Sequence, residues 1–252
     1  MGTSIDGLFQ RELERRGIAF TRDSGTGGYS LKTGDRTQLI SLENLAREYA
    51  IDRDPECVPR FVDAILHGGF LLDWKIARES VLFCLEPNDY VESCDLRLPV
   101  SRQVDRVPVL VDKRLRTCLW VTQGMLETWA VSVDEFTQVA SANLALALSS
   151  SKVEYSEIQN VKRGFFETEL PIKSPLLLAP NLKEVVETIV GWPLQAVIPD
   201  QDFIYIWPAA DERFCERVGA VVLREYSTAS HPVTTELLRI DDDGIQALGN
   251  FA

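Results

Sequence analysis

Two histidines limit the catalytic groups that the sequence offers. His231 precedes Pro232 in a loop that also contains Ser227 and Ser230, so the fold could assemble a nucleophilic serine beside a histidine base. No Gly-x-Ser-x-Gly turn, which would expose such a serine, is present. His67 ends an expected helix before two glycines, where an imidazole caps the helix. We therefore predict no catalytic residue, and a hydrolase-like enzyme with a fold-assembled carboxylate and histidine site is the alternative.

The motifs of metal and cofactor sites are not recognisable in the sequence. The glycine-rich stretch 25–28 lacks the Lys-Ser/Thr pair of a phosphate-binding loop and is typical of the start of a hairpin. The acidic stretch 241–244 has neither the alternating acids nor the later glutamate of an EF-hand. Five scattered cysteines, an odd number without a Cys-x-x-Cys pair, indicate reduced thiols. We predict no cofactor and no bound metal.

Charge is distributed unevenly along the chain, which has a net charge of −12. Residues 51–95 and residues 199–252 each carry ten acids and four bases, whereas residues 97–116 carry six bases and two acids. An acidic surface repels the phosphate backbone, so we do not expect nucleic acid as a partner. Two alternatives remain, an acidic face that attracts a basic partner and the pairing of the two signs on folding.

We predict that the acidic C-terminal third binds another protein and has no enzymatic function. Its acidic residues flank the expected strands and helices. Trp192 adjoins an expected turn, and tryptophan is a frequent anchor of protein interfaces. The candidate partner-binding residues are Asp200, Asp202, Asp211, Glu212, Asp241, Asp242, Asp243 and Trp192. The protein could bind in order to neutralise a basic partner, as toxin-neutralising proteins do, or to act as a scaffold for it. Binding of a small ligand between pairs of strands is a third alternative.

The framework that must position these residues is a succession of strand pairs and helices. Apolar spacing predicts helices at 3–17, from 41, 54–66, 132–148, 181–190 and 211–226. Apolar runs and period-two alternation predict strands at 29–31, 38–40, 80–85, 107–111, 115–121, 153–158, 164–170, 194–198, 203–207 and 237–240. Strands come in pairs, which favours an α+β fold with mixed or antiparallel sheets, strand-strand-helix units and helices on one face.

Three local signals refine this framework. Ser132 and Asn181 each stand three residues before a glutamate, the spacing of a capping box at the start of a helix. Pro108 interrupts an expected strand, and because proline has no amide hydrogen we expect that strand at a sheet edge. We divide the chain into an N-terminal region 1–125 and a C-terminal region 126–252, with one continuous domain as the alternative.

The location of the protein also follows from apolar patterning. No stretch reaches the roughly 18 consecutive apolar residues that a membrane span needs. The first residues include Asp6 and a charged run from Arg11 to Arg16 where a signal peptide would be apolar. We therefore predict a cytoplasmic protein without membrane association.

Several stretches of the chain resemble the uncharacterised bacterial YtpQ-like family, the domain of unknown function 1444. They are residues 129–148 (beginning Trp-Ala-Val-Ser-Val-Asp-Glu-Phe), 39–49 with 58–61, 107–112, 196–202, Tyr226 and 234–238 (Thr-Thr-Glu-Leu-Leu). The resemblance implies an α+β cytoplasmic bacterial protein. It implies no activity and transfers no catalytic residue. Residues 199–202, Pro-Asp-Gln-Asp, depart from the family, whose later strands have Asn or Arg beside the Asp.

Overall fold

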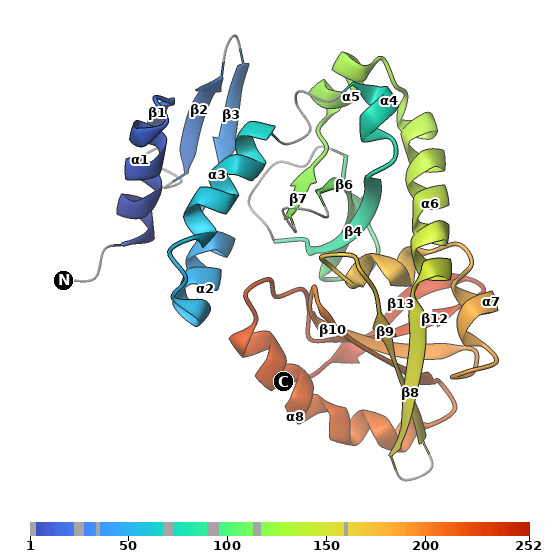
Figure 1. The fold of residues 1–252 in the computed structure, drawn as a ribbon. Coiled ribbons are helices and arrows are strands. Elements are labelled where there is room, and N and C mark those ends of the chain that lie inside the picture. The colour runs from blue at the N-terminus through green and yellow to red at the C-terminus, as the bar shows by residue number, and fades with distance from the viewer. Residues whose placement is uncertain are drawn as a thin grey trace. The chain divides into compact units, whose positions relative to one another are not determined.

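The computed structural model describes residues 4–22, 28–33, 36–67, 73–89, 96–112, 117–158 and 161–252 (Figure 1). Helices and antiparallel strand pairs follow one another along these residues, which confirms the α+β class. The chain forms two compact units, Met1–Leu71 and Leu72–Ala252. No helix of the described residues is both long and apolar enough to cross a membrane.

The first unit is a three-stranded antiparallel sheet with three helices (Figure 1). Its elements are α1 (Ile5–Arg15), β1 (Ala19–Arg22), β2 (Tyr29–Thr33), β3 (Arg36–Ile40), α2 (Glu43–Asp52) and α3 (Cys57–His67). The core joins one face of α1 and α3 to β2 through fully buried side chains. These include Phe9, Leu13, Tyr29, Leu31, Val58 and Val62. The predicted helices and the hairpin of this unit are confirmed, and β1 is an additional strand.

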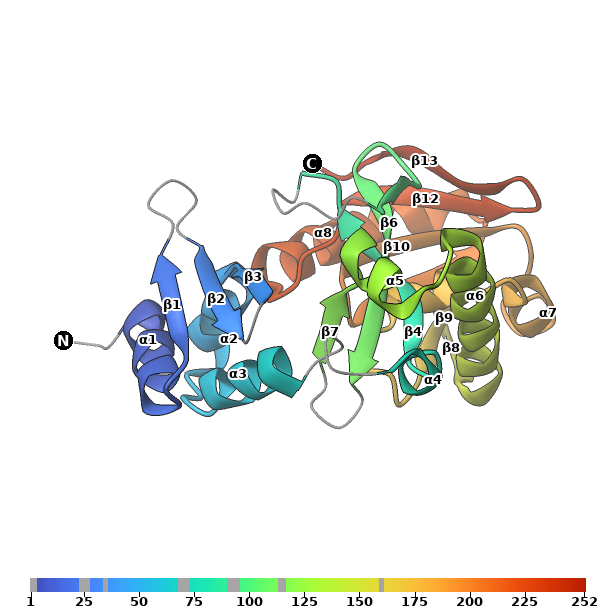
Figure 2. The same ribbon diagram turned by 90° about the horizontal axis from the view of Figure 1, so that it is seen from above.

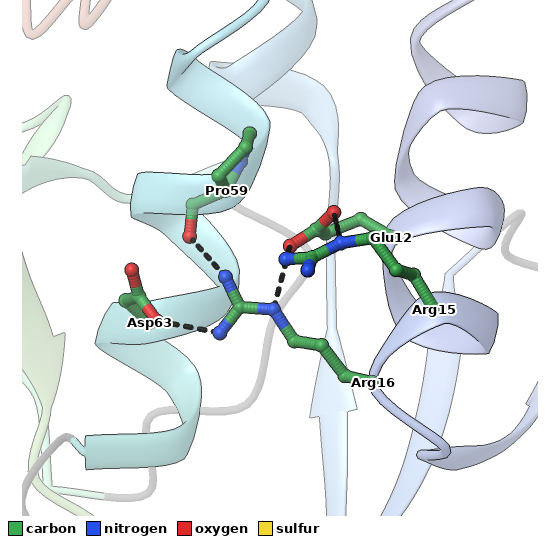
Figure 3. Close-up of polar contacts among 5 residues, drawn as sticks. All are labelled: Glu12, Arg15, Arg16, Pro59 and Asp63. Atoms are coloured by element: carbon green, nitrogen blue, oxygen red, sulfur yellow. Dashed lines mark hydrogen bonds and ion pairs between the residues drawn. The ribbon is translucent and has the colours of Figure 1, made fainter.

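A network of ion pairs links α1 to α3 (Figure 3). The Glu12 carboxylate accepts hydrogen bonds from Arg15 and from Arg16 Nε, the latter at 2.6 Å. Arg16 also donates to Asp63 Oδ1 at 2.5 Å and to the carbonyl oxygen of Pro59 at 3.3 Å, both on α3. Hydrogen bonds from Arg15 lower the pKa of Glu12 to about 2, aided by Arg16 and opposed by burial. Arg16 is therefore the residue of this network that bonds to both helices.

The second unit begins with a four-stranded antiparallel sheet. Its strands are β4 (Val81–Pro87), β5 (Leu98–Pro99), β6 (Val104–Asp112) and β7 (Thr117–Trp120), with β6 in the centre. The helices are α4 (Trp74–Ala77), α5 (Gln123–Trp129) and α6 (Val133–Ser150). The hydroxyl of Ser132 accepts a hydrogen bond from the amide of Glu135, so this predicted cap is confirmed. Residues 113–116, which include the start of the strand expected at 115–121, lie outside the described residues.

The prediction that Pro108 marks an edge strand was wrong. Pro108 lies in the middle of β6, opposite Phe83 of β4, and β7 pairs with the other side of β6. Its carbonyl oxygen accepts from the amide of Val121, one residue past the end of β7. In an antiparallel pair the amide and carbonyl of one residue point to the same side. The missing amide hydrogen therefore faces the end of the β7 ladder, and proline is tolerated in a central strand.

A six-stranded antiparallel sheet forms the rest of this unit (Figures 1 and 2). Its order is β13 (Gly244–Asn250), β12 (Glu236–Asp241), β10 (Leu194–Asp200), β11 (Phe203–Pro208), β9 (Val161–Glu167) and β8 (Lys152–Ile158). The helical segments are η2 (Ser174–Leu178), α7 (Leu182–Val186) and α8 (Glu212–Thr228). Helix α8 packs on one face through a buried cluster of Val161, Val197, Trp207, Phe214, Val218 and Val222.

Two features differ from the expected framework. Asn181 does not cap α7: its side chain donates to Ala145 O and to Ser149 Oγ of α6, so it fastens the helix start to a neighbour instead. The compact units divide between residues 71 and 72 and not between 125 and 126, because α6 packs against β4 and joins the two predicted regions.

Candidate functional site

The turn between β12 and β13 carries the acidic run Asp241 to Asp243. Asp241 fixes the turn: one carboxylate oxygen accepts from the amide of Asp243 at 3.0 Å and the other from Arg239 Nε at 2.8 Å. Arg239 lowers the pKa of Asp241, aided by the amide of Asp243. Asp242 and Asp243 are exposed. Asp241 is therefore a structural residue, whereas its two neighbours present their carboxylates to solvent.

Asp242 connects this turn to α7 and to Trp192. Lys183 Nζ lies 2.9 Å from Asp242 Oδ1, and Trp192 Nε1 donates to the same oxygen at 3.1 Å. Lys183 Nζ also lies 5.7 Å from the centre of the Trp192 ring, in a cation–π arrangement. The Lys183 ammonium lowers the pKa of Asp242. The exposed fractions of the side chains are 39% for Lys183 and 71% for Asp242, so this ion pair adds little to stability.

More carboxylates surround the same lysine. Glu184 and Glu187 are exposed on and beside α7 and raise the pKa of Lys183 together with Asp242. We name this surface the acidic end. It is formed by the carboxylates of Glu184, Glu187, Asp241, Asp242 and Asp243, the cations of Lys183 and Arg239, and the indole of Trp192. The carboxylates outnumber the cations, so the surface is negative.

Asp211 and Glu212 lie toward the same end of the six-stranded sheet. Leu194 pairs with both Pro208 and Ile240, so the segment after β11 and the turn after β12 leave the sheet at the same end. Asp211 is the residue before α8, makes no capping hydrogen bond through its side chain and has a buried Oδ1 without a partner. The side chain of Glu212 lies outside the described residues.

Asp200 and Asp202 lie at the opposite end of the sheet. Asp200 is the last residue of β10 and Asp202 follows in the turn; β10 starts at the acidic end with Leu194, and six steps along a strand span about 20 Å. Asp200 accepts hydrogen bonds from the amides of Asp202 at 2.8 Å and His231 at 3.3 Å. The predicted partner-binding residues therefore fall into two groups, and the structure brings together those around Trp192.

The histidine loop next to Asp200 has a serine beside the imidazole. Ser230 Oγ lies 3.0 Å from His231 Nδ1, a contact between consecutive residues. Asp200 contacts the main chain of His231, whereas the carboxylate of a catalytic triad contacts the imidazole. These contacts shape the loop.

Glu86 is a candidate that the sequence analysis did not single out. It shares one face of the four-stranded sheet with Cys84 and Trp120, whose Sγ and Nε1 donate to its Oε1 at 3.1 and 3.5 Å. Burial raises the pKa of Glu86 to about 6, and these hydrogen bonds oppose the shift. Burial strongly raises the pKa of the Cys118 thiol, and the charges of Glu86 and Asp202 raise it further. Cys118 is thus a protonated thiol at neutral pH.

Replacing Glu86 with glutamine should stabilise the protein at high pH and not at low pH. The folded state raises the pKa of this carboxyl from 4.5 to about 6, so its favourable contribution is present below pH 4.5 and is lost as the pH rises through 6. We expect the Glu86→Gln substitution to raise the free energy of unfolding by about 2 kcal/mol at pH 8 relative to its effect at pH 4. Urea unfolding at both pH values measures this, and a pH-independent difference would contradict it.

Glu236 is the second residue that sequence reasoning missed. It is fully buried at the start of β12, Ser101 Oγ lies 2.5 Å from its Oε2, and Oε1 is buried without a partner. A pocket of about 100 Å³ reaches this side chain and is lined also by Arg102, Ala247, Gly249 and Asn250. Period-two alternation could have found this residue, because Glu236 shares a face with the buried Leu238 and Ile240.

The other cysteine, histidine and carboxylate side chains of the described residues form neither a metal cluster nor a disulfide. Among the described residues, no three His, Cys, Asp or Glu side chains are placed to share a metal ion. Four of the five cysteines lie in the described residues and form no disulfide, namely Cys57, Cys84, Cys118 and Cys215. Cys94 lies outside the described residues.

Comparisons with known proteins give no relative for this fold or site. A scan against family models, a search of curated proteins and a search of solved structures each found no significant match. The resemblance to the YtpQ-like family stays a prediction.

Proposed function

We propose that the protein acts by binding a basic protein partner through the acidic end, without catalysing a reaction. One observation supports this most directly: Asp242, Glu184 and Glu187 surround a single ammonium, that of Lys183, so the surface keeps excess negative charge. Trp192 lies within it and supplies the amphipathic ring that interfaces favour. The bases of the acidic end therefore do not neutralise all of its acids.

The exposed ion pair between Lys183 and Asp242 is also easily exchanged. Because a pair this exposed stabilises the fold by little, a partner's arginine or lysine can replace Lys183 at low cost. A negative patch speeds the encounter with a positive one, and this attraction weakens as salt is added. A cytoplasmic role in which the protein neutralises or scaffolds its partner is the version that we propose.

Capture from an extract of the source cells tests this proposal. The double variant Asp242→Asn with Asp243→Asn removes two exposed carboxylates, and the control Glu157→Gln with Glu167→Gln removes two from strands β8 and β9 at the opposite edge of the sheet. We expect wild type and control to capture the same basic protein, and the acidic-end variant to lose it. Capture should also fail at about 1 M salt, where the Debye length is about 3 Å. Absence of a captured protein, or capture that neither salt nor the variant changes, would overturn the proposal.

The hydrolase-like alternative is favoured by one observation, the raised pKa of Glu86. A carboxylate with a pKa of about 6 suits a general base near neutral pH. This alternative predicts hydrolysis of a simple ester, amide or phosphoester substrate that Glu86→Gln abolishes. Equal rates for wild type and variant, or no hydrolysis of any of these substrates, would contradict it.

A further inference from the structure

Strand β13 forms an uncharged edge of the six-stranded sheet (Figure 2). It is the last strand of that sheet and pairs with β12 alone among the described strands. Its sequence, Gly-Ile-Gln-Ala-Leu-Gly-Asn, contains no charged residue and no proline. Edge strands usually carry such residues, because they keep another strand from pairing with the open main chain. Strand β8, at the opposite edge, does so with Lys152, Glu154 and Glu157.

The part of β13 next to the acidic end pairs regularly with β12. Gly244 to Ala247 pair in register with Asp241 to Leu238, and the register shifts only beyond them. Alternate residues of an antiparallel strand direct their N–H and C=O groups to opposite neighbours. Half of the residues from Gly244 to Ala247 therefore present both groups at the open edge. Within the described chain, these groups form no main-chain hydrogen bond outside β12, so a further strand could satisfy them.

The side chains along this stretch determine the pattern that a further strand would carry. Directly paired residues of antiparallel strands share a face of the sheet. Ile245 and Ala247 are half-buried on one face, where they pair with buried residues of β12. Gln246 is exposed on the other face. An added strand would therefore place apolar side chains beside Ile245 and Ala247 and a polar one beside Gln246.

The carboxylates before β13 determine the charge of such a strand. Asp242 and Asp243 are exposed in the turn directly before Gly244. An added antiparallel strand runs in the opposite direction to β13, so the residues that follow its paired stretch pass these two carboxylates. Lysine or arginine at those positions would meet opposite charge, whereas the Asn250 end of β13 offers none.

We propose that the partner of the acidic end binds by adding an extended segment to β13 as a further antiparallel strand. The segment alternates apolar and polar residues opposite Gly244 to Ala247 and then carries lysine or arginine. The strand pairs of this sheet are antiparallel, and antiparallel pairing is slightly more stable than parallel pairing. The inference rests on the proposed function and specifies the form in which the basic partner binds.

Two peptides of identical composition test this proposal on the full-length protein. The forward peptide, acetyl-Val-Thr-Val-Thr-Lys-Arg-amide, brings its cations to Asp242 and Asp243 when it pairs antiparallel with β13. The reversed peptide, acetyl-Arg-Lys-Thr-Val-Thr-Val-amide, has the same charge but brings its cations to the Asn250 end. With the forward peptide we expect saturable shifts of the Gly244 to Ala247 amide resonances and slower exchange of the outward amides. The reversed peptide should bind at least about tenfold more weakly.

N-methylation of the central Thr-Val amides of the forward peptide separates strand pairing from charge. It removes two amide hydrogens and keeps both cations, so we expect at least about a tenfold loss of affinity. The double variant Asp242→Asn with Asp243→Asn should weaken the forward peptide by a similar factor. The control Glu157→Gln with Glu167→Gln, at the β8 edge, should bind it as wild type does.

The outcomes distinguish strand addition from the proposed function. Equal affinities of the forward, reversed and N-methylated peptides would show attraction by charge alone, which overturns strand addition and leaves the proposed function standing. Equally tight binding of the forward peptide to wild type and to the Asp242 and Asp243 double variant would overturn the choice of a basic segment. Absence of binding by the forward peptide would also overturn strand addition, and capture from the cell extract would then decide the proposed function by itself.

Discussion

Replacing Gln201 with alanine should lower the free energy of unfolding of the second unit by about 3 kcal/mol. Gln201 is 5% exposed in the turn between β10 and β11. Its Nε2 donates to the carbonyl oxygen of Leu85 in β4 at 2.6 Å, and its Oε1 accepts from the hydroxyl of Ser174 in η2. Alanine would leave both groups buried without a partner, and each such loss costs about 1–3 kcal/mol.

The same substitution at a solvent-facing glutamine provides the control. Gln246 is exposed on β13, so Gln246→Ala should change the free energy of unfolding by less than about 0.5 kcal/mol. Urea unfolding followed by tryptophan fluorescence measures both variants, because Trp207 is fully buried in this unit. A Gln201→Ala variant as stable as Gln246→Ala would show that the side chain does not link the two sheets.

Replacing Arg16 with glutamine should destabilise the first unit by about 3 kcal/mol at pH 7. The substitution removes the cation that contacts both Glu12 and Asp63, and it leaves Glu12, which is 8% exposed, with Arg15 alone. The lowered pKa of Glu12 means that this carboxylate contributes stability above pH 4.5 and loses it as the pH falls toward about 2. The effect of Arg16→Gln should therefore shrink as the pH falls below 4.5.

The exposed Arg11 of the same helix provides a matched control. Arg11→Gln removes the same charge and should change stability by less than about 0.5 kcal/mol. Hydrogen exchange of the α1 and α3 amides measures both variants and separates this unit from the rest of the chain. Equal protection in the two variants, or a penalty that is the same at pH 4 and pH 7, would contradict this role of Arg16.

Local sequence signals predicted the structure well where the contact joins residues that are close in sequence. Ser132 caps α6 as its spacing indicated. The predictions were wrong where contacts between residues distant in sequence determine the structure. Asn181 has the sequence spacing of a helix cap, but its side chain bonds to α6. Pro108 lies in a central strand because the amide hydrogen that proline lacks would point past the last residue of β7.

The candidate site was predictable only in part, for the same reason. The acidic run Asp241–Asp243 is visible in the sequence, but the contact of Asp242 with Lys183 joins residues 59 positions apart. The separation of Asp200 from this run depends on which end of β10 each turn occupies. Ser101 and Glu236 are 135 positions apart, and no sequence spacing brings them together.

A photo-crosslinking residue in place of Asp243 tests the proposed function most directly. We expect it to form an adduct in the source cells with one basic protein, and a crosslinker in place of the exposed Glu157 on β8 to form none with that protein. Asp242→Asn in the same chain should reduce the adduct at position 243. Equal labelling from both positions, or an acidic partner at position 243, would contradict binding through the acidic end.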